Sequence, residues 1–213
     1  ADLVIGEDDT WQEVLTEKSV FRWGRLLDPE LGRGGLISGE GFLASLYGPI
    51  EQTRFEELPL RLSVVATDFW RREQVVYEHG PFRPAVEGSS AIPGLFVPVR
   101  MDDRLLVDGG AVNPVPWDVL AAECDVTIGV DVTGTRSRTE DLSSLDAVFN
   151  TFEIMQASIV AAKRAHAGPD IYVEPDIVDV RALEFYRLDE ILDQAQPARE
   201  ALGRRLAERL ERA

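Results

Sequence analysis

Residues 116–132 constrain the fold more than any other part of the sequence. Pro116 suits the first turn of a helix that continues through Val119 and Leu120. The apolar run at 126–132 then has the length and the β-branched content of a buried strand. Because a helix followed directly by a buried strand is the repeating unit of an α/β sheet, the sequence predicts an α/β fold.

Five further runs have the alternation or the β-branched content of strands: residues 60–67, 74–79, 97–100, 104–107 and 171–173. Residues 69–72 are expected to turn the chain between the first two runs. Met101-Asp102-Asp103, with its acidic pair, suits a hairpin turn between the next two. The run at 171–173 is expected at an edge or at the end of a sheet.

Apolar side chains at helical spacing predict helices in several stretches, which begin near Thr10, Ser38, Pro81 and Leu142 and before Leu202. In the last of these, Leu202, Leu206 and Leu210 follow one another at i, i+4, and Pro197 is expected to kink or divide the helix. No internal repeat, low-complexity stretch or linker interrupts the chain. Residues 1–213 are therefore expected to form a single domain.

The charge balance limits the partners of the chain. Thirty-eight acidic and 22 basic side chains give a formal net charge of −16, which opposes binding to nucleic acid. Cys124, the single cysteine, gives no sign of an oxidising compartment, and no apolar run reaches the roughly 18 residues that span a bilayer. We expect a cytoplasmic protein that contacts a membrane at most peripherally. Because the first residues lack a secretory signal and an initiator methionine, the chain is also expected to begin inside a longer protein.

Asp108 is the main candidate for chemistry. It ends an apolar strand pattern and is followed by Gly109 and Gly110. An isolated Asp-Gly dipeptide is a common turn. Here, however, the carboxylate stands at the end of a strand, and the glycines allow backbone and substrate to approach closely. This placement is typical of a catalytic carboxylate.

Four sequence blocks, in this order, resemble bacterial patatin-like phospholipases: Arg33-Gly-Gly-Leu-Ile-Ser-Gly, Val65-Ala-Thr-Asp, Ser89-Ser-Ala-Ile-Pro-Gly-Leu-Phe and Val107-Asp-Gly-Gly-Ala-Val-Asn-Pro. The resemblance is strongest over residues 33–132. It implies a three-layer α/β domain with a mainly parallel central sheet. It also implies a catalytic dyad of a serine and the aspartate of an Asp-Gly-Gly motif, with no metal or organic cofactor, and it assigns that aspartate to Asp108.

Two parts of the family pattern are not found in this sequence. The family has a glycine-rich oxyanion loop and a Gly-x-Ser-x-Gly elbow before the Arg-Gly-Gly block, so the N-terminal part of the domain is expected to be missing from the 213 residues. Gly35-Leu-Ile-Ser-Gly and Gly88-Ser-Ser-Ala-Ile place serines near glycine, but neither fits the elbow. The expected site residues are therefore Asp108, Gly109 and Gly110, with no nucleophile in the chain.

A serine needs a base within hydrogen-bond reach, and that base is commonly a histidine. His79 and His166 both lie outside any glycine-framed motif, so neither is favoured. A carboxylate in a partly dehydrated cleft can take the proton directly. Asp68, Asp131 and Asn113 are interpreted as structural, and Asp102-Asp103 as a solvated turn and not a cation site.

The leading hypothesis is therefore hydrolysis of a lipid or other acyl ester with Asp108 as the base. The alternatives are a non-catalytic binding or regulatory module of the same fold, and acyl transfer between lipids. The sequence leaves the oligomeric state open. Because an incomplete sheet exposes its edge and faces, the chain expressed alone is expected to be poorly soluble.

Phe69-Trp70-Arg71-Arg72 permits two interpretations. At a hairpin tip, the aromatic rings would insert at a lipid interface while the arginines meet head groups. Alternatively, Trp70 folds back against a neighbouring helix.

Overall fold

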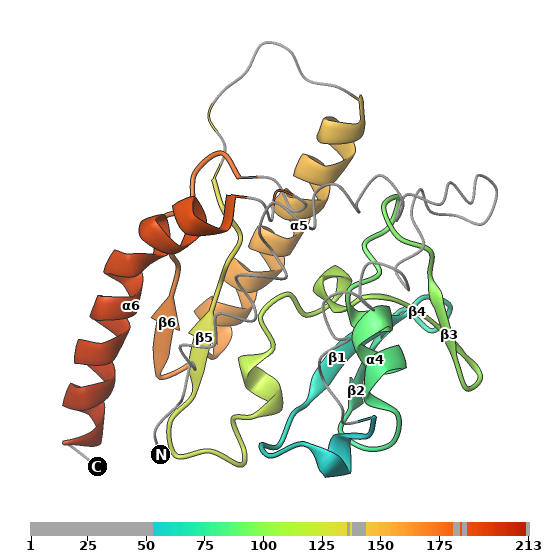
Figure 1. The fold of residues 1–213 in the computed structure, drawn as a ribbon, viewed down its shortest axis with the longest axis horizontal. Helices are drawn as coiled ribbons and strands as arrows, with labels where there is room; N and C mark the ends of the chain where they lie inside the picture. Colours follow the sequence, from blue (N-terminus) through green and yellow to red (C-terminus); the bar gives the residue numbers. More distant parts are fainter. Residues whose placement is uncertain (1–52, 136, 138–143, 181–183, 185–186, 212–213) are drawn as a thin grey trace. The chain divides into compact units, whose positions relative to one another are not determined.

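The computed structural model describes residues 53–135, 137, 144–180, 184 and 187–211. The chain divides into two compact units, Ala1–Val112 and Asn113–Ala213, whose elements appear in Figure 1 and are described separately below. The single domain expected for residues 1–213 stays a prediction. The helices expected near Thr10 and Ser38 lie outside the described residues.

The first unit contains a four-stranded sheet with strand order β2-β1-β4-β3. Its strands are β1 (Val64–Asp68), β2 (Glu73–Tyr77), β3 (Val99–Met101) and β4 (Arg104–Asp108). All neighbouring strands in it are antiparallel, so the expectation of a mainly parallel central sheet is wrong for this sheet. Tight turns join β1 to β2 and β3 to β4, and a short turn can join only antiparallel neighbours.

Both turns lie where the sequence predicts them. Arg72 in the first turn and Asp102 in the second have φ values of 58° and 54°, in the left-handed region that turns use. Asp68, at the end of β1, is 2% exposed, and its carboxylate accepts the backbone N–H groups of Trp70 and Arg71. This buried carboxylate fixes the first turn, in agreement with the structural role expected for Asp68.

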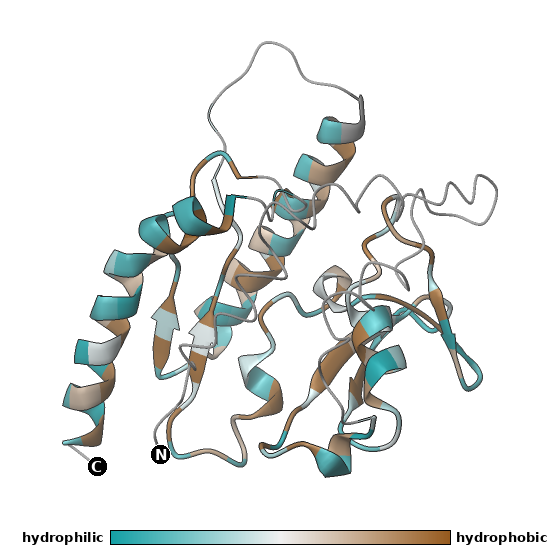
Figure 2. Ribbon diagram, viewed as in Figure 1, coloured by the Kyte–Doolittle hydropathy of each residue, from teal (hydrophilic) through white to brown (hydrophobic). Residues whose placement is uncertain are grey.

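The core of the first unit forms between β1 and helix α4 (Phe82–Ser89). All five side chains of β1 are buried, as the apolar and β-branched run requires. Helix α4 begins after Pro81, as predicted, and packs Phe82 and Ala85 against Val64 and Phe55. Phe55 belongs to the short 3₁₀ turn η1 (Phe55–Glu57), and its ring meets that of Phe82 edge to face at 5.9 Å. Figure 2 shows β1 as a hydrophobic strand.

The second unit contains two parallel strands, β5 (Ile128–Val130) and β6 (Ile171–Val173), and two helices, α5 (Ser144–His166) and α6 (Leu188–Leu210). This strand pair has the parallel arrangement that the family resemblance implies. Gly129 and Tyr172 occupy one face of the pair, where Tyr172 packs against Val160 of α5 and the ring of Trp117. Ile171 and Val173 are buried on the other face, and α6 contacts β6. The long helix expected from Leu142 is confirmed as α5.

The helix expected from Pro116 is only a 3₁₀ turn, η3 (Trp117–Val119). In an α-helix the carbonyl of Val115 would accept the N–H of Val119. Here that carbonyl accepts from the Lys163 ammonium and the Trp117 N–H instead, and the Val119 N–H donates to the Pro116 carbonyl. A tertiary contact from α5 therefore replaces the helical hydrogen bond.

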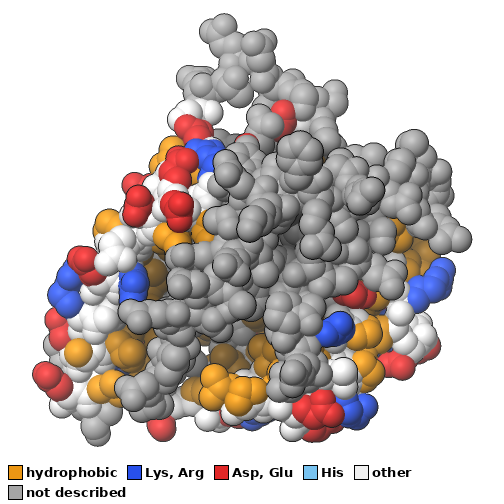
Figure 3. Space-filling model, in the orientation of Figure 1, with side chains coloured by type: hydrophobic (Ala, Val, Ile, Leu, Met, Phe, Trp, Pro, Cys, Tyr) orange, Lys and Arg blue, Asp and Glu red, His pale blue; other side chains and the backbone are white. Residues whose placement is uncertain are grey.

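Helix α6 runs without a break through Pro197, so this proline does not divide the helix, and the kink expected as the alternative stays a prediction. Leu202 and Leu206 are half-buried, whereas Leu210 is exposed. Figure 3 shows acidic and basic side chains side by side along α6, at the left of the view. None of the helices in the described ranges has the length and the apolar character that crossing a membrane requires.

Strand β5 leaves one apolar face uncovered. Ile128 and Val130 are 37% and 45% exposed, and Val132, just beyond the strand, is 70% exposed. These side chains alternate with the buried Gly129 and Asp131, so they share one face of the strand. Among the described residues β5 pairs only with β6, so none of them pairs with its other edge.

We expect the 213-residue chain expressed alone to be mostly insoluble, because this face and edge favour association between copies. Replacing both Val130 and Val132 with lysine should raise its soluble yield several-fold, as measured by the supernatant fraction after lysis. The matched control is Leu60→Lys in the first unit, which changes an apolar side chain with nearly the same exposed fraction (72%) as Val132. A fully soluble, monodisperse wild-type chain would contradict this expectation.

Candidate functional site

The backbone of Asp108 is held from both sides at the end of β4. Asp108 lies opposite Ala66 of β1, and its carbonyl accepts the Thr67 hydroxyl at 2.8 Å. Its N–H donates to the carbonyl of Ala91 at 3.0 Å, just after α4. The position of Asp108 is therefore set by β1 and by the segment that follows α4.

The carboxylate of Asp108 caps the next turn of the chain. Residues Gly109–Ala111 form the 3₁₀ turn η2, and the N–H of Gly110 donates to Oδ1 of Asp108 at 2.6 Å. Among the described residues, this is the hydrogen bond that orients the carboxylate. None of the described residues donates a hydrogen bond to Oδ2.

Gly109 is required by a close approach of two backbone segments. A β-carbon at this position would lie 2.2 Å from the carbonyl oxygen of Val65, well inside contact distance. Only glycine lets β4 and η2 pass β1 this closely. The first glycine of the Asp-Gly-Gly motif thus has a steric function and the second a hydrogen-bonding function.

The sequence blocks that suggested a family meet at this point. The block at 65–68 supplies the carbonyl beside Gly109 and the Thr67 hydroxyl. The block at 89–96 supplies the Ala91 carbonyl, and its Ser89 hydroxyl donates to the Val65 carbonyl at 2.7 Å. Ser89 therefore has a structural role in this arrangement. The block that begins at Arg33 lies outside the described residues.

Burial changes the acidity of the carboxylate. Removal from water raises the pKa of Asp108 above its ordinary value, and the hydrogen bond from Gly110 opposes this effect in part. A carboxylate with a raised pKa is a stronger base than one in water, so it accepts a proton from a hydroxyl group more readily.

The histidines show no such arrangement. His79 is largely exposed and lies 4.0 Å from the carboxylate of Glu56, and His166 is exposed at the end of α5. Asp131 accepts hydrogen bonds from the Thr133 N–H and the Tyr172 hydroxyl, the structural role that its place in an apolar strand suggests. Asp103 is exposed and paired with Arg71.

Within the described ranges, no group of three or more histidine, cysteine, aspartate or glutamate side chains is arranged to hold a metal ion.

Sequence reasoning missed a second polar cluster, centred on Lys163 of α5. Its ammonium donates to the Asn113 side chain, the Val115 carbonyl and the Asp118 carboxylate, and it lies 4.0 Å from the centre of the Trp117 ring. Asn113 also donates to Asp118, in agreement with the structural role expected for Asn113. The cluster joins residues about 50 positions apart, and no local pattern marks Lys163 as their common contact.

Lys163→Met should lower the stability by about 2 kcal/mol, because it removes the hydrogen bonds that the ammonium donates to the buried Asn113 side chain, the Val115 carbonyl and the Asp118 carboxylate. Thermal melting of the variant would measure the loss. Arg199→Met is the control, since Arg199 is an exposed cation on α6. Equal melting temperatures for the two variants would show that the Lys163 contacts contribute little.

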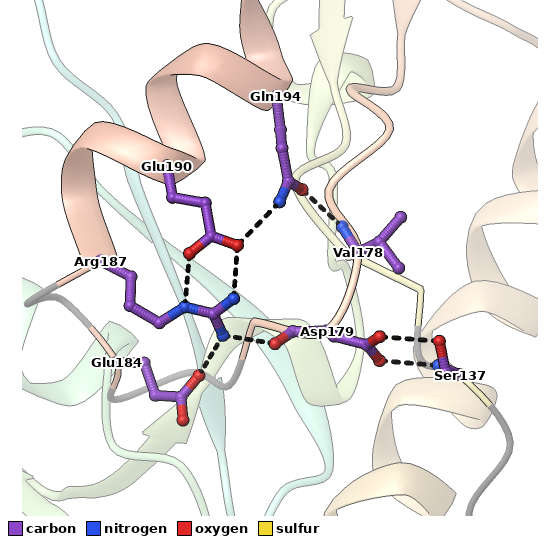
Figure 4. Close-up of polar contacts among 7 residues, drawn as sticks. All are labelled: Ser137, Val178, Asp179, Glu184, Arg187, Glu190 and Gln194. Carbon is purple, nitrogen blue, oxygen red and sulfur yellow. Dashed lines mark hydrogen bonds and ion pairs between the residues drawn. The ribbon is translucent and has the colours of Figure 1, made fainter.

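A third cluster fixes the start of α6, as Figure 4 shows. The Arg187 guanidinium lies between the carboxylates of Glu184 and Glu190, which raise its pKa, and it also donates to the Asp179 carbonyl. The Asp179 carboxylate accepts from the N–H and the hydroxyl of Ser137. These mutual contacts indicate a structural role for the cluster.

The fold and the Asp-Gly-Gly site agree with a known class of lipid hydrolases. The model of the patatin-like phospholipase family matches residues 6–121, more than half of the chain, and this range includes Asp108, Gly109 and Gly110. The chain belongs to the patatin-like phospholipase family.

Similar proteins occur in bacteria and eukaryotes. An uncharacterized NTE family protein of Mycobacterium tuberculosis is 34% identical over 128 residues, which cover 60% of this chain and 35% of that protein. A second one from the same species is 27% identical over 197 residues, covering 80% of this chain and 33% of that protein. A lysophospholipase of Saccharomyces cerevisiae is 23% identical over 194 residues, covering 79% of this chain and 12% of that protein. The chain thus spans about a third of the length of these mycobacterial relatives.

Proposed function

We propose that the protein hydrolyses an acyl ester bond of a lipid, with Asp108 as the base for a serine nucleophile. The observation that carries the proposal is the Asp108 carboxylate itself, held by the Gly110 N–H at the end of β4 and raised in pKa by burial. Family membership and the similarity to a yeast lysophospholipase support the choice of lipid esters.

In the proposed reaction, the serine hydroxyl transfers its proton to Asp108 as its oxygen attacks the acyl carbonyl. The C–O bond to the alcohol then breaks, and the alcohol leaves with that proton. Water attacks the acyl-enzyme, gives a proton to Asp108 and releases the fatty acid as the serine regains its proton. The steric fit of Gly109 keeps the carboxylate in one position throughout.

No Gly-x-Ser-x-Gly sequence occurs in the 213 residues, so the proposal places the serine elsewhere in the protein. Labelling the intact protein with a fluorophosphonate probe, followed by peptide mass spectrometry, tests this placement. We expect a single labelled serine outside this sequence. Labelling of Ser89 or Ser38 would refute the placement, and absence of labelling would refute a serine mechanism.

Product analysis tests the reaction class. Incubation of the intact protein with phospholipid or lysophospholipid should release free fatty acid. Acyl transfer would share the acyl-enzyme with hydrolysis and would differ only in the group that attacks it, which is an alcohol of the acceptor lipid in place of water. If added acceptor lipid takes up most of the acyl groups, the protein is a transferase and the hydrolysis proposal is wrong.

A further inference from the structure

The turn between β1 and β2 presents two aromatic side chains to solvent. Phe69 is 47% exposed and Trp70 is 72% exposed. Their rings lie edge to face, with centroids 4.9 Å apart, so they pack on each other. The high exposure of Trp70 excludes the interpretation in which this side chain folds back against a helix. We call residues 69–72 the aromatic turn.

The backbone beneath these rings is firmly held. The N–H of Phe69 donates to the Leu105 carbonyl at 2.8 Å, and the N–H of Arg72 donates to the Asp68 carbonyl at 2.8 Å. The buried Asp68 carboxylate accepts from two further N–H groups of the turn and from Arg104 at 3.1 Å. Because the turn is ordered before it meets a ligand, binding costs little additional conformational entropy.

The charges around the turn indicate which surface it suits. Arg71 is paired with Asp103 at 2.6 Å and lies 3.6 Å from Asp68. Arg104 contacts both Asp68 and Glu73. With Arg72 and Asp102 included, this region has four carboxylates and three guanidinium groups. The whole chain has a formal net charge of −16. An anionic surface would therefore repel the protein, whereas a zwitterionic one would not.

We propose that the aromatic turn docks the protein on a zwitterionic phospholipid surface, an inference that rests on the lipid substrate of the proposed function. Phe69 and Trp70 enter the boundary between head groups and acyl chains, where aromatic rings are favoured. The exposed Arg72 meets phosphate oxygens at the same depth.

The register connects this turn to the candidate site. Ala66 of β1 lies opposite Asp108, and the aromatic turn begins three residues further along the chain. At 3.3–3.4 Å per residue, the turn starts about 10 Å along the strand from Asp108. Docking of the turn would therefore hold the sheet that carries Asp108 close to the lipid surface.

The test is binding of the intact protein to phosphatidylcholine vesicles, measured by flotation. Changing both Phe69 and Trp70 to serine should reduce the partition coefficient at least about tenfold, because two aromatic side chains no longer enter the lipid. Leu60→Ser is the matched control, because Leu60 is as exposed as Trp70 (both 72%) but precedes β1. We expect binding of this control to stay close to wild type.

Salt and lipid charge provide a second measurement. Binding that depends on aromatic insertion should change little between low and physiological salt, and phosphatidylserine should not strengthen it. Failure of the wild-type protein to bind phosphatidylcholine, or equal binding of the double variant, would overturn the proposal. Binding that requires phosphatidylserine and disappears with salt would overturn it as well.

Hydrolysis of a soluble short-chain ester separates this inference from the proposed function. The double variant should cleave that ester as fast as wild type, while losing activity on vesicles. If no variant cleaves the ester, the proposed hydrolysis is wrong, and the vesicle binding still decides the docking proposal. If all variants cleave the ester and bind vesicles equally, hydrolysis stands and docking by the aromatic turn is wrong.

Discussion

Asp108→Asn should reduce ester hydrolysis by the intact protein between about 10²-fold and 10⁴-fold, the range expected for loss of a general base. Asparagine has nearly the same shape and can still accept the Gly110 N–H, so the backbone arrangement should persist. The measurement is kcat on a soluble ester. We expect the main loss in kcat and not in KM, because the base acts in the transition state.

The matched control is Asp102→Asn. Asp102 is exposed and has a φ of 54°, a conformation that asparagine tolerates well, so activity and stability should stay close to wild type. Wild-type activity in the Asp108→Asn protein would show that another group removes the serine proton, and the proposed mechanism would then be wrong.

Because the pKa of Asp108 is raised, Asp108→Asn should also change how the stability of the protein depends on pH. Since the folded state holds a proton that the unfolded chain releases, this group contributes its full stability below the ordinary aspartate pKa and loses it as the pH rises through the raised pKa. Asp108→Asn avoids this loss. It should therefore melt slightly above wild type at neutral pH, and the difference should disappear in acid. Wild-type hydrolysis should fall as the pH drops through the same pKa, because the base becomes protonated.

Gly109→Ala should destabilise the protein by about 3 kcal/mol or more, enough to remove most of the soluble protein. The added β-carbon would meet the Val65 carbonyl oxygen at 2.2 Å, and this neighbour is backbone in a fully buried strand. Neither β1 nor η2 can move without breaking the hydrogen bonds that hold Asp108. Soluble yield and thermal melting would measure the effect.

Gly203→Ala makes the same chemical change, but it should increase the stability of the protein. Gly203 lies inside α6, and a β-carbon there would meet nothing within 4 Å. Alanine should stabilise the helix by about 0.5–1 kcal/mol. If both variants melt alike, the close approach at Gly109 does not limit stability, and the steric explanation of the motif is wrong.

Local patterns predicted most of the secondary structure in the described residues. The turns at 69–72 and 102–103, the helix after Pro81 and the long helix α5 follow from turn residues and apolar spacing. The hairpin turns predicted at 69–72 and 101–103 also indicate antiparallel neighbours in the first sheet, as found, whereas the mainly parallel sheet was implied only by the family resemblance.

The remaining differences come from long-range contacts. The helix expected after Pro116 is shortened because Lys163, 48 residues after Val115, binds the Val115 carbonyl. The Asp108 position itself was predictable from Asp-Gly-Gly at a strand end. The reason for Gly109 was not, because the Val65 carbonyl approaches from a different strand.

The register between β1 and β4 limits how the length of this protein can change. Side chains alternate between the two faces of a strand, so inserting or deleting one residue within β4 would turn Asp108 toward the opposite face of the sheet. A change of length in the turn at 102–103 leaves that register intact, because β4 begins after it. Homologous sequences aligned on Asp108 should therefore have gaps at this turn and none between residues 104 and 109.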